Sequence, residues 1–329
     1  MPTWGDVIQE IQRENTQGTQ NAVDVVRRRY LGQLALHTGR STILYTTRWT
    51  VPPVNVPGDL LSIVEEDTQG FMEVFHGLPR NGLDIILHSP GGSAEATEGL
   101  VTYIRSRYND VRIIVPHLAM SAATMLACSA NRILMGRHSY LGPIDPQMPS
   151  GESYVPAQAI LDQFEIAKDE CQNPALLGAW APILPQYGPA LLVQCREAIQ
   201  LSKRLVAAWL RSYMFQGDRR RYEKARLVAR RLSGHQAYLT HGRHIGKDQA
   251  KRIGLLVDDL ESDQRLQDLV LSVFHASNIT FQGTGAVKLI ENHMGRAYIR
   301  IVQTQVIAPP VPPPAAPSGP PAQPPPGPP

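Results

Sequence analysis

The chain has 329 residues, of which 43% are hydrophobic, 19% charged and 6% aromatic. This length suffices for one large domain or two smaller ones with a sizeable core, and the apolar fraction excludes a wholly disordered chain. Proline, glycine or charge interrupts every apolar run before the roughly 18–20 residues that span a bilayer, so the sequence predicts no transmembrane helix. The start lacks an apolar stretch behind basic residues, and the three cysteines form no Cys-x-x-Cys pair. We therefore expect a cytoplasmic protein without a secretory signal.

The net charge of +3 is unevenly distributed. Residues 196–231 hold eleven Lys and Arg against three acidic residues, which leaves −5 for the remainder of the chain. Such a segment could contact nucleic-acid phosphates or an anionic membrane surface. Tyr222 is the only aromatic residue of the most basic run, 218–231. We therefore see no strong nucleic-acid signal and no indication of a membrane surface, and expect a solvated face or a subunit contact.

The predicted elements begin with an amphipathic helix over residues 1–30 and then alternate between strand and helix. Apolar, β-branched and helical patterns indicate strands at 41–49, 83–89, 111–119 and 131–136, and helices at 59–77, 94–108, 121–130, 155–175 and 186–232. Strands that alternate with helices predict parallel crossover units and an α/β fold. A turn-helix-turn at 241–260 would close the globular unit.

Proline dominates the end of the chain, where it supplies 13 of the 22 residues from 308 to 329. Such a segment forms neither helix nor ladder, so we expect a disordered, polyproline-II-like tail that acts as a spacer or binds a partner groove. We divide the chain into a helical lead-in at 1–40, a main domain at 41–300 and the Pro-rich tail at 301–329.

Two loops follow predicted strands at their carboxyl ends, where parallel sheets collect ligands. Ser89-Pro90-Gly91-Gly92 precedes a helix, so its free amides could form an oxyanion hole, or it could be an ordinary tight turn. Ser121 also stands at a helix start among small residues, where its hydroxyl could be exposed as a nucleophile or could cap the helix. Local features alone leave both alternatives open.

These motifs carry a resemblance. The segment 87–147, with its S-P-G-G and A-M-S-A-A-T runs, resembles the serine dehydrogenase proteinase family, as do residues 65–71 and 241–259. This family of Clp/crotonase-fold serine peptidases is related to signal peptide peptidase A and the Clp protease proteolytic subunit. The resemblance implies a spiral of ββα units, a homo-oligomer and hydrolysis of peptide or protein substrates. It also implies Ser121 as the nucleophile, with the amides of Gly91, Gly92 and Ala122 as oxyanion donors.

The general base is not at its Clp position, because the stretch 139–146 contains no histidine and His138 comes too early. Relatives of the signal peptide peptidase type use a lysine some 40–50 residues after the serine, and Lys168 is the lysine within that reach. Ile160 and Lys168 share one predicted helix face, so the amine could lie beside apolar surface, where desolvation lowers a lysine pKa. The alternative is a surface lysine beside Glu165. Asp145 is a candidate auxiliary residue, for orienting the base, for binding substrate or for holding a turn.

The remaining histidines suggest no metal. His88 and His117 end buried strands and are expected to be core histidines, while His235, His241 and His244 could not be placed. The Gly-x-Gly at 283–285 lacks the third glycine of a dinucleotide fingerprint, so we predict no cofactor.

Two further functions compete with a serine peptidase that uses a Ser/Lys dyad. One is a catalytically inactive scaffold that recruits partners through the basic helix and the Pro-rich tail. The other is a crotonase-like acyl-transfer enzyme, although no feature near residues 87–92 would hold coenzyme A.

Overall fold

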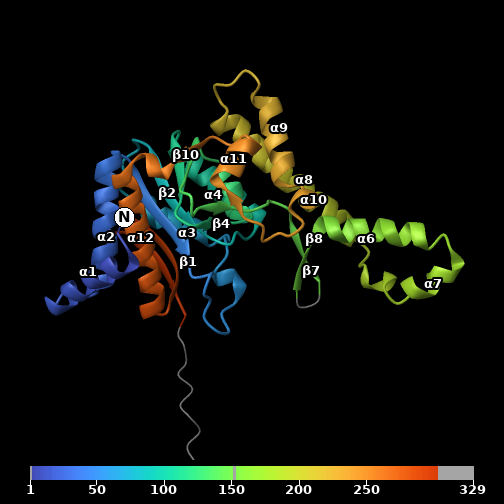
Figure 1. Cartoon of the computed structure of the whole chain (residues 1–329), viewed down its shortest axis with the longest axis horizontal. Coiled ribbons are helices and arrows are strands. Elements are labelled where there is room, and N and C mark those ends of the chain that lie inside the picture. The colour runs from blue at the N-terminus through green and yellow to red at the C-terminus, as the bar shows by residue number, and fades with distance from the viewer. Residues whose placement is uncertain (1, 151–152, 303–329) are drawn as a thin grey trace, which may run out of the picture.

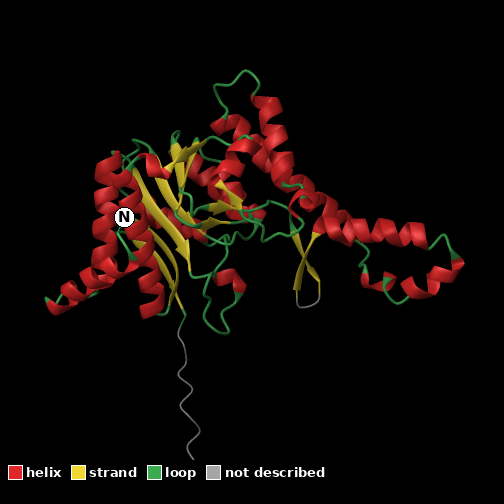
Figure 2. Cartoon of the chain, viewed as in Figure 1, coloured by secondary structure: helices red, strands yellow, loops and turns green. Residues whose placement is uncertain are grey.

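The structure, a computed structural model, describes residues 2–150 and 153–302. Its centre is a seven-stranded sheet in the order β10-β5-β3-β2-β1-β11-β12 (Figures 1 and 2). The strands from β10 to β1 are parallel, whereas β11 and β12 are antiparallel additions at one edge. The predicted α/β fold is thus confirmed. The strands of this sheet are β1 Ser41–Thr47, β2 Leu83–His88, β3 Val111–Val115, β5 Arg132–Met135, β10 Val257–Asp259, β11 Ala286–Asn292 and β12 Ala297–Ile301.

Helices cover both faces of the sheet. Helices α1, α2 and α12 pack together on one side, and α4, α5 and α8 lie on the other (Figure 1). The α-helices are α1 Trp4–Thr16, α2 Ala22–Thr38, α3 Asp67–Phe75, α4 Ala94–Arg107, α5 Ala122–Cys128, α6 Ala157–Glu170, α7 Pro174–Trp180, α8 Leu191–Trp209, α9 Arg221–Leu232, α10 His235–Tyr238, α11 Lys247–Ile253 and α12 Gln264–Gly283. Short 3₁₀ turns lie at Gly58–Leu60, Leu184–Gln186 and Leu260–Ser262, and a π turn, Leu210–Met214, follows α8.

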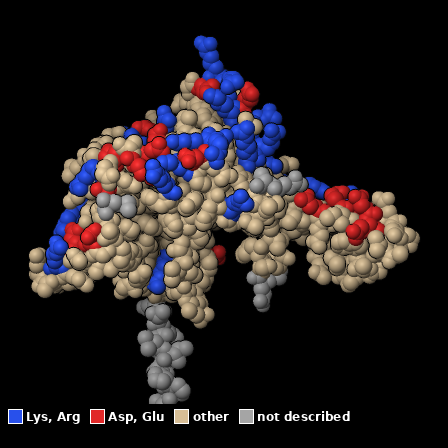
Figure 3. Space-filling model, viewed as in Figure 1, with Lys and Arg blue, Asp and Glu red and all other residues tan. Residues whose placement is uncertain are grey.

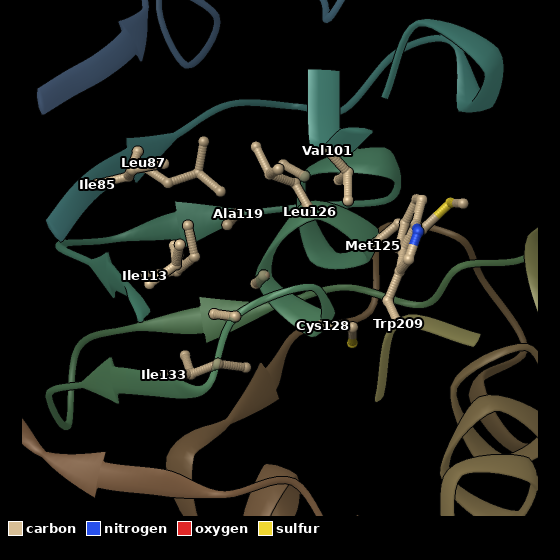
Figure 4. Packing of buried hydrophobic residues seen from close by; sticks show 14 of the residues in the cluster. Ile85, Leu87, Val101, Ile113, Ala119, Met125, Leu126, Cys128, Ile133 and Trp209 are labelled. Atoms are coloured by element: carbon tan, nitrogen blue, oxygen red, sulfur yellow. The ribbon is translucent and has the colours of Figure 1, made fainter. Parts of the chain in front are cut away.

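The strand β2 shows why a nearly continuous apolar run suits a strand covered on both faces. Ile85 and Leu87 point into the cluster formed with α4, α5 and α8, whereas Ile86 between them points into the cluster formed with α2 and α12. Figure 4 shows the first cluster, with Ile85 and Leu87 near Leu126 of α5. Full burial of each such side chain contributes about 1.5–3 kcal/mol.

The predicted helix at 1–30 is divided into two helices by a turn that contains Gly18, with φ of 79°, and Asn21, with φ of 54°. Both helices pack on the main body rather than forming a separate unit. Arg27 of α2 is fully buried and donates to Glu291 of β11 at 2.6 Å and to Thr280 of α12 at 2.6 Å. The lead-in is therefore joined to α12 and β11 near the end of the described chain.

The predicted strand at 111–119 is interrupted at Pro116, which has no amide hydrogen for a ladder. Residues 118–119 leave the main sheet as β4 and form a small second sheet in the order β4-β6-β9, where β6 is Tyr140–Leu141 and β9 is Ile245–Gly246. The antiparallel pairing of β9 with β6 brings a late segment of the chain close to the turn that contains Ser121.

Of the predicted helix at 59–77, only α3 is α-helical, after the short 3₁₀ turn at its start. The residues between them are not α-helical, because the backbone of Ile63 pairs with Gly92. The predicted helix at 155–175 is α6, which belongs to an arm that projects from the body (Figure 1). The arm begins at the hairpin of β7 Gln147–Ser150 and β8 Ser153–Pro156 and continues through α6 and α7. The Pro-rich segment 303–329 lies outside the described residues.

Candidate active site

Ser121 lies in the turn between β4 and α5 with φ of 50° and ψ of −120°. A non-glycine residue with such a positive φ costs about 1–3 kcal/mol and is found most often at functional sites. Its side chain makes no capping hydrogen bond to α5, so the helix-cap alternative does not hold. Every residue of α5 is buried, which fixes the turn against the body.

The loop Ser89–Gly92 lies directly against this turn. A Cβ on Gly91 would come within 2.7 Å of the Met120 carbonyl oxygen and 2.8 Å of the Ser121 Cβ. A Cβ on Gly92 would come within 2.5 Å of the Ile63 nitrogen. Both glycines also have positive φ, 104° and 150°, so the two positions exclude a side chain for steric and conformational reasons.

Hydrogen bonds to Ile63 orient the amide of Gly92. The Ile63 N–H donates to the Gly91 carbonyl at 2.6 Å, and the Ser93 N–H donates to the Ile63 carbonyl at 3.0 Å. In a trans peptide the C=O and N–H point in opposite directions, so the Gly92 N–H points away from Ile63. The Gly91 N–H, in contrast, donates to the Ser89 hydroxyl at 3.2 Å. Within the described residues, the amides of Gly92 and Ala122 find no acceptor, so both N–H groups are free to donate to a bound group.

A buried charged network holds the segment that contains Ile63. Lys288 of β11 donates to Asp67 at 2.6 Å and to the Ser62 carbonyl at 2.7 Å, and Tyr45 of β1 donates to Asp67 at 2.5 Å. Burial lowers the pKa of Lys288 below its ordinary value, although the Asp67 carboxylate opposes this change. Burial beside Asp67 raises the pKa of Tyr45 well above its ordinary value. No local sequence pattern predicted this network, because its members lie far apart in the chain.

A cleft of about 600 Å³ opens over the turn that contains Ser121. Its lining includes Ser121, Gly91, Gly92 and Ala122, which the sequence grouped together, and also His241. One wall is apolar and carries side chains of α5, the β7–β8 hairpin and α8, namely Met125, Met148, Tyr154 and Leu201. Its volume is in the range of about 300–1,000 Å³ that is usual for small-ligand sites.

His241 and Asp145 form a hydrogen-bonded pair at this cleft. The Nδ1 atom of His241 lies 2.8 Å from one carboxylate oxygen of Asp145, whose side chain is 4% exposed. The Nδ1 atom of His235 lies 3.4 Å from the other oxygen, beyond hydrogen-bonding geometry. The β6–β9 pairing brings the segment of His241 to Asp145. The sequence identified Asp145 but could not place His241.

Lys168 lies outside the cleft in this chain. It is on the arm helix α6, its side chain is 56% exposed, and its Nζ pairs with Glu165 at 2.6 Å. Ile160 and Ala167 on the same helix are buried, but Lys168 lies on a part of the helix surface that no described neighbouring element covers. The base role of Lys168 stays a prediction that this geometry does not favour.

Of the two strand-end histidines, His88 is a core residue, as expected, whereas His117 is only half-buried. His88 is 1% exposed, and its ring stacks on that of His117 at 5.7 Å between centroids. Burial, with a smaller contribution from the charge of His117, lowers the pKa of His88 to about 3. Among the described residues, no group of three or more His, Cys, Asp or Glu could hold a metal ion. None of the described helices combines the length and apolarity that crossing a membrane requires.

The fold and this cleft define a ClpP-like α/β protein with a serine at a strained turn beside free backbone amides. Residues 63–181, which contain Ser121 and the glycine loop, match the family of ClpP-like SDH-type serine proteinases. The match ends before His241.

Two similar curated proteins come from Methanocaldococcus jannaschii. Uncharacterized protein MJ0137 is 28% identical over 198 residues, which cover 60% of each chain. Uncharacterized protein MJ1495 is 25% identical over 197 residues, which cover 60% of this chain and 59% of that protein. The chain thus matches about three fifths of the length of these relatives. Among solved structures, a mutant of the membrane-bound stomatin-specific protease 1510-N is similar at 16% identity and a TM-score of 0.34, over 60% of this chain and 75% of that one.

Proposed function

We propose that this protein is a serine endopeptidase in which Ser121 is the nucleophile, His241 the general base and Asp145 the residue that orients the base. The observation that carries the proposal is that His241, which lines the cleft together with Ser121, has its Nδ1 atom 2.8 Å from the buried carboxylate of Asp145. The match of residues 63–181 to a serine proteinase family supports the reaction class.

The chemistry follows from the available protons. With Nδ1–H donating to Asp145, Nε2 of His241 accepts the proton of Ser121 as Oγ attacks the peptide carbonyl. The amides of Gly92 and Ala122 donate to the resulting oxyanion, and each such donor stabilises the transition state by about 2.7–4 kcal/mol. His241 then gives its proton to the leaving amine. Water attacks the acyl-enzyme in the same way, releasing the carboxylate and restoring the Ser121 hydroxyl.

Gly91 has a different part in this proposal from the one expected from the resemblance. Its positive φ of 104° and its contact with the Ser121 turn shape the loop, while its N–H is engaged with Ser89. The donors proposed here are therefore Gly92 and Ala122.

Self-association is part of the same proposal. The arm exposes large apolar side chains at Tyr154, Ile166, Leu176 and Leu177. Apolar side chains gathered on a projecting arm suit a contact with another copy. The cytoplasmic location and binding of a partner by the Pro-rich tail stay predictions.

The test is the rate of covalent labelling by a fluorophosphonate, followed by intact mass. Wild type should gain one adduct, Ser121→Ala none, and His241→Gln should react about 10²–10⁴ times more slowly, the contribution of a general base. Lys168→Met should react like wild type, because its amine lies outside the cleft.

Slow labelling of Lys168→Met together with normal labelling of His241→Gln would restore the Ser/Lys dyad and overturn the base assignment. A folded wild type that gains no adduct would favour the inactive scaffold. A reaction that requires coenzyme A would favour the acyl-transfer alternative.

A further inference from the structure

A second cavity lies between α8 and α9, on the far side of α8 from the catalytic cleft. Its volume is about 640 Å³, and it is lined by five basic side chains, Tyr222 and four alanines, with no acidic residue among them. Figure 3 shows Lys and Arg gathered over these helices. The basic residues of this groove are Lys203, Arg204, Arg211, Arg226 and Arg230.

These five cations are not neutralised by the protein. Among the described residues, none of the five has a carboxylate within ion-pair distance. The nearby Asp218 pairs with Lys224, which does not line the groove. Five like charges in one concavity repel one another, so an anion that binds there gains the interaction of all of them.

The geometry of the groove suits a short chain of anionic groups. The basic residues of one wall, on α8 and the π turn that follows it, span positions 203–211, and those of the other wall, Arg226 and Arg230 on α9, lie one helical turn apart. At about 1.5 Å per residue, the charge of the first wall is distributed over about 12 Å and that of the second over about 6 Å. Four alanines form the floor, Ala207, Ala208, Ala225 and Ala229, and leave room between the walls.

Four of the five cations are guanidinium groups, whose planar donors match phosphate oxygens in pairs. Arg211 also lies over the ring of Tyr222 at 5.0 Å, which holds one end of the groove in a defined shape. The volume is that of a small-ligand site rather than of an extended nucleic-acid channel or a flat membrane face.

We propose that the α8–α9 groove binds a chain of two or three phosphates, either free or as part of a nucleotide. This site is separate from the catalytic cleft and does not depend on the proposed peptidase activity. No residue of the groove belongs to the catalytic machinery.

The test is isothermal titration of the full chain with sodium tripolyphosphate at two NaCl concentrations. Wild type should bind one equivalent, more weakly at higher salt. The double variant Arg204→Gln/Arg226→Gln removes one guanidinium from each wall and should lose about tenfold or more in affinity, since hydrogen bonds between charged groups are individually strong. The double variant Arg219→Gln/Arg220→Gln removes the same charge just outside the groove and should lose much less.

ATP distinguishes the two sources of phosphate. Equal affinities for ATP and tripolyphosphate support recognition of the phosphates alone, and tighter binding of ATP supports a nucleotide. The proposal is overturned if tripolyphosphate and ATP both fail to bind. It is also overturned if the two double variants weaken binding equally, or if only oligonucleotides or anionic vesicles bind. Unchanged thermal unfolding temperatures show that the variants are folded.

Discussion

The Nδ1 atom of His241 lies 2.8 Å from the carboxylate of Asp145, although 96 positions separate the two residues in the chain. The carboxylate is almost completely buried, and the imidazole reaches the cleft above it. A carboxylate in this place fixes the ring orientation and the tautomer of the histidine.

Replacement of Asp145 by asparagine should therefore lower kcat by about 10²–10⁴-fold, because an amide favours the wrong tautomer of His241. KM should change little. The measurement is steady-state hydrolysis of a fluorogenic peptide, with His244→Gln as the control. His244 stacks on Tyr140 and does not line the cleft, so its variant should retain nearly full activity. A larger loss of activity in His235→Gln than in His241→Gln would contradict the assignment of His241 as the base.

Gly92→Ala should lower kcat by about 10²–10³-fold with KM nearly constant, since the donor acts on charge that develops in the transition state. The added Cβ would lie 2.5 Å from the Ile63 nitrogen at a φ of 150°, so the loop must shift and turn its N–H. Gly178→Ala is the matched control, because a Cβ there meets nothing within 4 Å. Equal kinetics of the two alanine variants would contradict the orienting role of Ile63.

Lys288→Met should lower the free energy of unfolding by about 3–5 kcal/mol, because it leaves Asp67 buried without its cation. The double variant Lys288→Met/Asp67→Asn should recover part of this loss. Urea unfolding measures both. Lys251→Met breaks an exposed pair with Asp259 and should cost at most about 1 kcal/mol. A Lys288→Met protein as stable as wild type would show that the network does not hold the segment 58–67.

The pKa of His88, about 3 in the folded chain against an ordinary 6.5, predicts a pH dependence of stability. Between these values the unfolded chain binds a proton that the folded chain does not, so the free energy of unfolding decreases as the pH falls from about 6.5. The slope for one such group is at most about 1.4 kcal/mol per pH unit.

His88→Phe removes this titrating group. It also removes the acceptor of the Leu118 N–H, which lowers the stability by an amount that does not depend on pH. The difference in unfolding temperature between wild type and His88→Phe should therefore narrow as the pH falls from 7 to 5. Replacement of the exposed His76 by glutamine should leave the profile of wild type unchanged. Parallel profiles for wild type and His88→Phe would refute the prediction.

The sequence predicted the elements that local patterns determine. The apolar runs at 83–89 and 111–119 indicated neighbouring parallel strands, and β2 and β3 do pair in that way, with Ile85 opposite Ile113. The glycine loop and the Ser121 turn also lie together at one cleft. Short motifs that follow clearly apolar strands therefore predicted both the fold and the place where the two loops meet.

Tertiary pairing decided what the sequence could not predict. The strands β6 and β9 have two residues each, too few for a periodic signal, yet they bring His241 to Asp145. The face of α6 suggested an apolar site for Lys168, but a helical pattern does not say which residues the neighbouring elements cover. The antiparallel edge strands β11 and β12 were not predicted.

The two hydrogen bonds between Ile63 and the glycine loop also bear on how the Ser-Pro-Gly-Gly motif is read in other chains. The glycines of the motif make the loop flexible, but the direction of the Gly92 N–H depends on hydrogen bonds to Ile63, about thirty positions earlier in the chain. A homologue that keeps the motif and loses the partner segment would retain the signature without the donor. Annotation of activity from the motif alone would then assign catalysis to proteins whose loop can rotate freely.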